Sequence, residues 1–492
     1  MDQGVFQICG SIRFASHIPS HMREVRQGSI KNVKNDVASG LKTVEGIILK
    51  HPLITWWLVA CVSMMLYLLN GKIATFDVLC HTYRLDQLSA GLWVHEPENI
   101  YLGGKRHVCG NTAVNSPFAY LFAIVPWSIT RSGLAVCVVN GIAAAGLCAV
   151  AMALAGKWRW AIMAVCSMPV TLVSLAWMGA DAMSIAAAML LLGVIFGVVD
   201  EDSWTSKHTG AATIILIADS LLLGQLKSNL CLLAGLTLML PLLARRRWEW
   251  WRSLAACFAQ AASTLAWMIL VHGITPVYCE NATSCSYYDH GYGDRWAQFG
   301  ADPFEAMRSL VITLFGWVMD SRRIGTEWAL ATGVGTFWNE LALTPLMGLI
   351  GLLPVLAVAF LRMIGWFDHV DEDITGRLKI LLAVWSAAFV ALTAFMVLMV
   401  CAYSVYGGQI IGLQGRYFVY MIPVVLMALP RLRWVRIDPP VPDDEKGLLE
   451  ADPAGRSHTA VGSRGASPRV QAVLLGLSLA ASATIGVAGL IA

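Results

Sequence analysis

Residues 181–200 read DAMSIAAAMLLLGVIFGVVD, with an acid at each end and no charged residue between them. An α-helix needs roughly 20 mostly apolar residues to cross the hydrocarbon core of a bilayer. The stretch therefore predicts a membrane-spanning helix over 182–199, with Asp181 and Asp200 at its two ends.

The same pattern recurs on both sides of this stretch, along most of the 492 residues. The chain is 57% hydrophobic and only 14% charged, and its mean hydropathy is +0.63, which excludes an ordinary soluble protein. We expect an all-α, polytopic membrane protein with about eleven transmembrane helices. The predicted spans are 54–70, 132–155, 160–177, 182–199, 211–224, 228–244, 253–275, 342–363, 378–404, 415–430 and 470–491.

Lys and Arg residues gather in alternate loops, and cytoplasmic loops of membrane proteins carry the excess of these residues. Seven of them lie in the first 53 residues, which places the N-terminus inside and, after eleven spans, the C-terminus outside. This bias requires that the short apolar stretches 115–130 and 306–320 lie at the membrane surface without crossing it. The expected domains are a basic cytosolic tail (1–53), a transmembrane domain (54–430), a flexible cytosolic linker (431–469) and a C-terminal transmembrane helix (470–492).

Four of the twelve cysteines fall on the predicted outer side. An oxidising exterior permits a bridge between Cys279 and Cys285, and a second one between Cys80 and Cys109. The spacing of these cysteines is not that of a metal site, so we predict no bound metal from them.

The first outer loop, residues 71–131, is too long for a simple connection. Early in it, Asp77, His81 and Arg84 are spaced four and three residues apart, so they share one face if the segment is helical. An acid and an imidazole can take a proton from a hydroxyl, and an arginine can hold a phosphate. The alternative is a solvated helix face that carries an incidental ion pair.

Three further charged residues lie at the outer ends of predicted spans. Asp181 stands where a helix N-cap is expected, so a capping role explains it equally well. Lys227 lies in the outer turn between the fifth and sixth spans, where snorkelling to the interface is the alternative to a phosphate contact. Arg416 borders an apolar run, and because a buried arginine is costly, we expect it to have an anionic partner, either a ligand or a structural acid.

Polar residues are otherwise rare inside the predicted spans. No ionisable residue sits at mid-span except Asp219, which lies nearer the outer end of its span. Transporters place polar groups and broken helices at the bilayer midplane and commonly show repeated halves, and this sequence shows neither. The concentration of polar residues at one interface favours an enzyme that acts on a lipid headgroup.

Five short motifs occur in the order found in one family of predicted bacterial membrane proteins. They are Asp77-x-x-x-His81-x-x-Arg84 with Asn115-Ser116-Pro117-Phe118-Ala119-Tyr120, then Gly179-Ala180-Asp181-Ala182, Leu226-Lys227, Phe315-Gly316-Trp317-Val318-Met319-Asp320 and Gln414-Gly415-Arg416-Tyr417-Phe418. Over residues 50–430 the chain thus resembles the family catalogued as domain of unknown function 2142. It departs from the family's motifs where Val78 replaces an acid and where Ser321-Arg322-Arg323 replaces a proline.

This family is similar in layout to glycosyltransferases of the GT-C type, which are multi-span enzymes that use polyprenyl-phosphate-linked sugars. The resemblance implies that Asp77 is the base that deprotonates an acceptor hydroxyl, with His81 as an orienting or second acid–base group. Lys227 and Arg416, with Arg84, have the chemistry to hold the donor phosphate. The other residues expected to contact the substrates are Asp181, Asp320, Gln414 and Tyr417.

We expect a membrane glycosyltransferase that moves a sugar, with inversion, from a polyprenyl-phosphate donor to an extracytoplasmic glycan or lipid-linked acceptor. Its partners would be these substrates and membrane lipid, and not nucleic acid. No cofactor is required, because cationic side chains can replace a metal at the phosphate; a divalent ion at Asp77 and Asp181 stays open. The alternatives are a transporter or flippase for a lipid-linked glycan and a non-catalytic subunit of a glycan-assembly complex. Aromatic faces for sugar stacking are offered by Tyr83, Trp93 and Tyr120.

Overall fold

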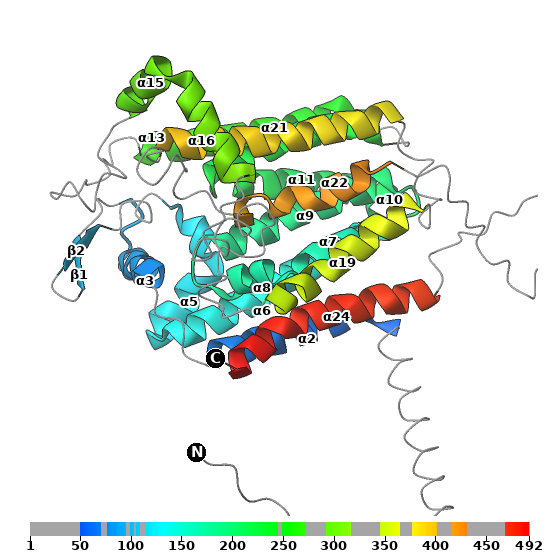
Figure 1. The fold of residues 1–492 in the computed structure, drawn as a ribbon, viewed down its shortest axis with the longest axis horizontal. Helices are drawn as coiled ribbons and strands as arrows, with labels where there is room; N and C mark the ends of the chain where they lie inside the picture. The colour runs from blue at the N-terminus through cyan, green and yellow to red at the C-terminus, as the bar shows by residue number, and fades with distance from the viewer. Residues whose placement is uncertain are drawn as a thin grey trace, which may run out of the picture. The chain divides into compact units, whose positions relative to one another are not determined.

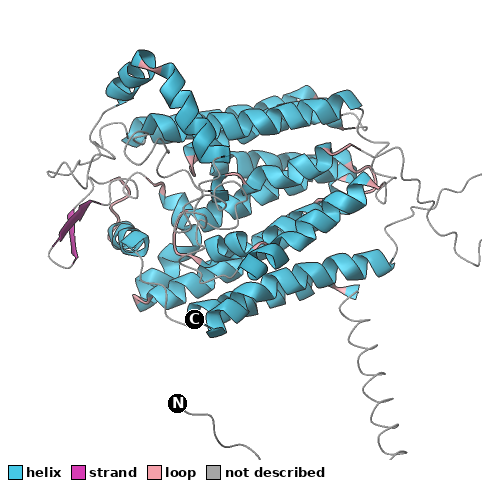
Figure 2. Ribbon diagram, viewed as in Figure 1, coloured by secondary structure: helices cyan, strands magenta, loops and turns pink. Residues whose placement is uncertain are grey.

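The computed structural model is helical, with one two-stranded hairpin in the part of the chain that it describes (Figures 1 and 2). From Leu53 onward the chain forms one compact unit. The structure describes residues 50–69, 76–94, 99–102, 105–108, 115–244, 248–271, 292–315, 345–364, 376–400, 415–430 and 468–491.

Six of the described helices are long and apolar enough to cross a membrane. They are α2 (Pro52–Leu69), α6 (Gly133–Leu154), α9 (Asp181–Val199), α13 (Trp250–Val271), α21 (Gly376–Val400) and α24 (Pro468–Ile491). A seventh crossing results if α7 (Arg159–Cys166) and α8 (Pro169–Ala176), which meet at 81°, together form one span. The bend falls at Pro169, which lacks a backbone donor and disfavours helical geometry in the residue before it.

The remaining predicted spans coincide with helices whose described apolar part is shorter than 18 residues. They are α11 (Thr209–Gly224), η3 (Ser228–Leu233) with α12 (Ala234–Leu243), α19 (Pro345–Met363), and η4 (Gly415–Tyr417) and η5 (Val419–Met421) with α22 (Ile422–Ala428). The multi-pass helical architecture is therefore confirmed. The count of eleven crossings stays a prediction.

Helix α9 lies at the centre of the packed helices. In its membrane window 94% of the residues are buried, against 22–44% in the other five candidate spans. Helices α6, α8 and α11 pack on it, and α6 comes close because Gly193 and Gly197 of α9 lie against the backbone carbonyls of Ala151 and Leu154. Small residues of this kind allow membrane helices to approach closely. The first residue of α9, Asp181, is thus held at a fixed place.

Short elements lie between α2 and α6 in the chain, and one of them, the 3-10 helix at 117–120, packs on α9. They are α3 (Phe76–Ser89), strands β1 (Asn99–Leu102) and β2 (Lys105–Val108), η1 (Pro117–Tyr120) and α5 (Leu121–Thr130). The strands form an antiparallel hairpin in which Ile100 lies opposite His107; the sequence did not predict it. The stretches 115–130 and 306–320, predicted to lie at the membrane surface, correspond to η1 with α5 and, in its described part, to α16 (Pro303–Phe315), which follows α15 (Tyr292–Ala301).

Candidate functional site

Three charged side chains from distant parts of the chain meet at the start of α9. Asp181 Oδ1 pairs with Lys227 Nζ, and Asp181 Oδ2 lies 2.9 Å from Arg416 Nε. The side chains of Asp181, Lys227 and Arg416 are only 14%, 21% and 9% exposed, so the three charges lie largely out of water. The capping role that the sequence allowed for Asp181 is not observed, because Ala180 is the N-cap and the carboxylate contacts the two cations instead.

Two tyrosines complete this group of side chains. The Lys227 Nζ lies 4.6 Å from the ring centroid of Tyr417, and the Arg416 guanidinium carbon lies 6.0 Å from the same centroid, which are cation–π distances. Tyr420 is fully buried and interacts electrostatically with Asp181, yet its Oη has no hydrogen-bond partner among the described residues. A buried hydroxyl without a partner indicates a position that water or a ligand group satisfies. We name these five residues the Asp181 cluster.

The turn that carries Lys227 is fixed by the neighbouring Gln225. The Oε1 of Gln225 accepts from Ser116 Oγ at 3.3 Å, and its Nε2 donates to the backbone carbonyl of Ser263 at 2.8 Å. Ser116 is the N-cap of η1 and Ser263 belongs to α13. The amide therefore ties the turn to two other elements, and Lys227 meets Asp181 from a fixed backbone.

His81 of α3 lies next to the Asp181 cluster. Its Nδ1 is 2.6 Å from Tyr120 Oη in a hydrogen bond, and the same Oη accepts from Asn115 Nδ2 at 3.1 Å. Both His81 and Tyr120 are buried, and His81 interacts electrostatically with Asp181. On the other edge of the imidazole, a Cβ added to Gly179 would lie 2.9 Å from Nε2. The ring is therefore held in one orientation from both edges.

The turn before α9 brings Gly179 to the imidazole of His81. Buried Asn140 of α6 donates from Nδ2 to the backbone carbonyl of Trp177 at 2.5 Å and so fixes this turn. Because Gly179 has no side chain, the turn approaches His81 closely, and a larger residue would have to displace the ring. Asn140 thus positions one wall of the site.

The Arg84 side chain donates hydrogen bonds to nearby backbone carbonyls. It is fully buried, and its NH2 donates to the carbonyls of Trp93 at 2.6 Å and Asn115 at 3.0 Å, while its NH1 donates to Leu92 at 3.3 Å. Burial lowers the pKa of the guanidinium from its ordinary value. The side chain fastens the end of α3 to the segment that carries Asn115, so the structure gives Arg84 a scaffolding position instead of a place in the Asp181 cluster.

The chain matches the model of a family described as predicted membrane proteins, domain of unknown function 2142, over residues 103–426. It belongs to this family. No curated protein and no solved structure matches the chain.

The match to domain of unknown function 2142 includes every member of the Asp181 cluster, as well as Tyr120 and Gly179. It begins after α3, so Asp77, His81 and Arg84 lie N-terminal to the matched residues. The family match therefore does not include the Asp77-x-x-x-His81-x-x-Arg84 motif, and its resemblance to the family stays a prediction from the sequence. Its helical spacing is confirmed, because all three residues belong to α3.

Several predicted site residues of this family member lie outside the described part of the chain. They are Asp320 and Gln414, together with the side chain of Asp77. Among the predicted aromatic residues, Tyr120 is fully buried against His81, whereas Trp93 is 61% exposed. The structure thus brings together Asp181, Lys227, Arg416 and Tyr417, with His81 beside them.

Cys80 of α3 is disulfide-bonded, as predicted for a cysteine on an oxidising side. Its partner lies outside the described residues, since the six other described cysteines are free. Cys109, Cys279 and Cys285 also lie outside them, so the pairing stays a prediction. In the described ranges no group of three His, Cys, Asp or Glu residues is arranged to hold a metal ion.

Proposed function

We propose that this chain is a membrane glycosyltransferase that moves a sugar from a polyprenyl-phosphate donor to an extracytoplasmic glycan or lipid-linked acceptor. The observation that supports it most is the meeting of Lys227 and Arg416 on one carboxylate at the end of the central span. A lipid phosphate lies at this depth of a membrane, and two convergent cations with low exposure are suited to bind it. We propose, as part of the same account, that the chain crosses the membrane eleven times and has the layout of GT-C enzymes.

The Asp181 cluster supports phosphate binding in two further ways. Tyr417 lies against Lys227, so the ammonium is held in place when no anion is bound. Tyr420 offers a buried hydroxyl that makes no hydrogen bond within the described residues, and a phosphate oxygen or a sugar hydroxyl is a suitable partner for it. In this proposal the phosphate adds to, or competes with, the Asp181 carboxylate at the two cations, and Gln414 and Asp320 contact the sugar.

The proposed reaction is a single displacement. Asp77 takes the proton from the acceptor hydroxyl, and the acceptor oxygen forms a bond to the anomeric carbon. The bond between that carbon and the donor phosphate oxygen breaks, and the phosphate leaves with the bonding electron pair, so the anomeric centre inverts. Lys227 and Arg416 stabilise the charge that grows on the phosphate. Asp77 lies one helical turn before His81 in α3, and His81, fixed by Tyr120, orients the acceptor.

The proposed orientation places this chemistry outside the cytoplasm and the N-terminus inside. Cys80 precedes His81 by one residue and is disulfide-bonded, and structural disulfides persist in oxidising compartments. The charge bias of the loops indicates the same orientation.

Transport of a lipid-linked glycan is a second candidate, and it has one observation in its favour. Asp219 of α11 is 3% exposed, and its carboxylate lies against the backbone of Leu191, midway along α9. Intramembrane acids of this kind are found in transport and proton pathways. Lys227, Arg416 and Asp181 would then bind the headgroup without chemistry.

Transfer from a panel of radiolabelled polyprenyl-phosphate sugars, with purified protein in lipid nanodiscs, tests the proposal. We expect transfer by the wild type, a loss of roughly 100-fold or more in Asp77→Asn if general-base catalysis operates, and a large loss in Lys227→Met. Arg131→Gln is the control, because the Arg131 side chain is 56% exposed and contacts Asp86, Ser89 and Trp127, none of which belongs to the Asp181 cluster. Folded wild-type protein that transfers no sugar from any donor, but moves a labelled lipid-linked glycan across vesicles, would favour transport instead.

A further inference from the structure

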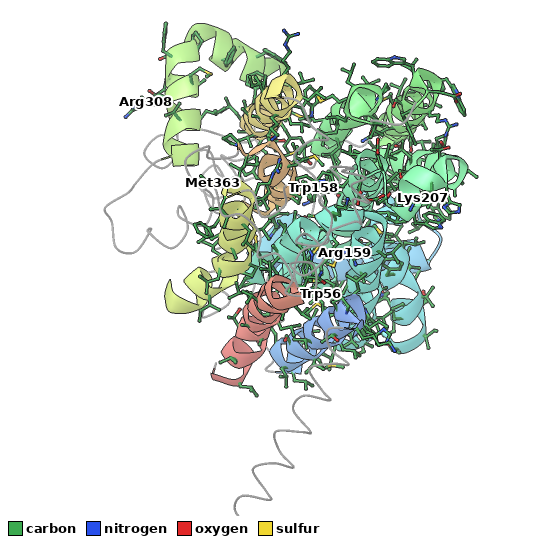
Figure 3. All side chains as sticks on the ribbon, turned by 90° about the vertical axis from the view of Figure 1, so that its right-hand side faces the viewer. Trp56, Trp158, Arg159, Lys207, Arg308 and Met363 are labelled. Atoms are coloured by element: carbon green, nitrogen blue, oxygen red, sulfur yellow. The ribbon has the colours of Figure 1, made fainter. Side chains whose placement is uncertain are left out.

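Helix α16 exposes an apolar stripe. Phe304, Met307 and Val311 are 86%, 48% and 51% exposed, and their spacing of three and four residues places them on one face. Arg308 lies at the edge of this stripe and pairs with Glu305 at 3.0 Å. Figure 3 shows Arg308 on the outer side of the helix. The exposed face thus combines three large apolar side chains with a cation at its border.

The opposite face of α16 packs against the site. Ala306 and Leu310 are buried in one apolar cluster with Ala394 and Leu398 of α21, and Tyr417 and Phe418 pack against this cluster. Tyr417 is the ring over which Lys227 lies. One side of α16 therefore supports the Asp181 cluster, and the other side is exposed with respect to the described residues.

The packing of α16 on α21 sets its depth in the membrane. Helix α21 runs from Gly376 to Val400, and α16 packs beside Ala394 and Leu398, in the last two turns of that helix. In the sequence, Arg308 and Asp320 bound an uncharged run of 11 residues, 309–319, which is too short to cross the hydrocarbon core. The segment therefore lies near the end of a span, at the boundary between hydrocarbon and headgroups.

We propose that α16 is an interfacial helix that binds the bilayer surface through Phe304, Met307 and Val311, and that this binding holds Tyr417 over Lys227. The occupant of the stripe is lipid, because a helix at this depth is adjacent to lipid wherever protein does not cover it. Its composition fits as well, since interfacial helices combine large apolar side chains with basic residues at the polar border. The supporting span α21 also exposes Ile380, Val384 and Leu392, as expected of a lipid-facing helix.

The proposal concerns the membrane contact of α16 and does not depend on glycosyl transfer. Replacing one apolar residue of the stripe with an acid should weaken the seating of α16 on the lipid. Because Leu310 and Tyr417 share one apolar cluster, the backbone around Tyr417 should then open more often. The cation pair at Asp181 would lose its aromatic support.

The first test is photo-crosslinking in phospholipid vesicles, with benzoylphenylalanine placed singly at positions 304, 307 and 311. Position 214 is the lipid-facing control, because Ile214 of α11 is 72% exposed, and position 202 is the control in a loop, because the Asp202 side chain is 59% exposed. We expect lipid adducts at 304, 307 and 311 at a yield comparable with 214 and well above 202. Adducts to a second copy of the chain or to another protein, or a lipid yield no higher than at 202, would overturn the proposal.

The second test is hydrogen exchange of the peptide that contains residues 417–421, in nanodiscs. Met307→Asp should raise its exchange rate several-fold, and Arg308→Gln, which leaves the apolar stripe intact, should not. Equal exchange in both variants would contradict the coupling between lipid and Tyr417, even if the crosslinking succeeds. Peptides of α9 serve as the measure of global folding, and their exchange should stay unchanged in both variants.

Discussion

Lys227 Nζ lies 4.6 Å from the ring centroid of Tyr417 while the same ammonium pairs with Asp181. The ammonium thus has two chemically different partners, a carboxylate on α9 and an aromatic ring in η4. They join segments that are far apart in the sequence at one end of the central span. The Asp181 cluster therefore has a structural role as well as the binding role proposed for it.

Removing the central carboxylate should destabilise the fold. In Asp181→Asn the Lys227 and Arg416 side chains, largely out of water, lose their shared anion and repel each other. Breaking a buried ion pair in this way costs about 3–5 kcal/mol, so the melting temperature in nanodiscs should fall by several degrees. Asp202→Asn is the control, because the Asp202 side chain is 59% exposed and an exposed pair contributes only about 0–1 kcal/mol. Equal melting temperatures for the two variants would contradict this role of Asp181.

A methyl group at position 179 should displace His81. The added Cβ of Gly179→Ala would lie 2.9 Å from His81 Nε2, closer than real contacts allow, so the imidazole must shift relative to Tyr120. We expect overpacking of about 1–3 kcal/mol and loss of sugar transfer if His81 orients the acceptor. Gly210→Ala is the matched control, since a Cβ there meets nothing within 4 Å. A Gly179→Ala protein with wild-type stability would show that the turn can move away from His81.

The hydroxyl of Tyr120 should contribute to the stability of the fold. Tyr120→Phe keeps the aromatic volume but removes the hydrogen bonds to His81 Nδ1 and from Asn115 Nδ2. Because an unsatisfied buried polar group costs about 1–3 kcal/mol, the variant should melt at a lower temperature. A melting temperature equal to that of the wild type would mean that water replaces the hydroxyl without cost.

Arg84 and Arg131 offer a direct test of the scaffolding position. Arg84→Met leaves the carbonyls of Leu92, Trp93 and Asn115 without their shared donor, so the segment after α3 should loosen. Limited proteolysis and hydrogen exchange should both increase between residues 90 and 116. Arg131→Gln removes a side chain that is 56% exposed and contacts Asp86 and Ser89 of α3 and the ring of Trp127, so it should change both measurements much less than Arg84→Met. Similar exchange in the two variants would assign no scaffolding role to Arg84.

The multi-pass helical architecture could be predicted from the sequence, because the length of an apolar segment is a local property of the chain. The described part of every predicted span coincides with one helix or with two or three consecutive helical elements, and the spacing of Asp77, His81 and Arg84 is that of a single helix. The need of Arg416 for an anion followed from the cost of burying it, but its partner could not be named. Asp181 lies 235 positions away in the sequence (416 − 181), and only the packing of α9 reveals the contact.

Several residues that position the site could not be recognised from the sequence. Tyr420 reads as part of an apolar run, Asn140 as a lone polar residue within a span, and Gln225 as a turn residue. Asn140 and Gln225 act through hydrogen bonds to other elements, and Tyr420 through a buried hydroxyl beside Asp181. No local sequence pattern encodes such contacts between distant elements. For Arg84 the sequence suggested a role that the structure does not show. An arginine can bind a phosphate, but the NH1 and NH2 of Arg84 donate to three backbone carbonyls.

The measurement that tests the central claim most directly is retention of a polyprenyl phosphate by the purified protein in native mass spectrometry. The account predicts a bound lipid on the wild type, at least tenfold less on Lys227→Met and on Arg416→Gln, and no loss on Lys157→Met. Lys157 pairs with Asp200 and Asp202 at the opposite end of α9, so it matches Lys227 in type and in pairing. Equal retention by all four proteins, or equal retention of the polyprenol that lacks the phosphate, would contradict the assignment of the Asp181 cluster as a lipid-phosphate site.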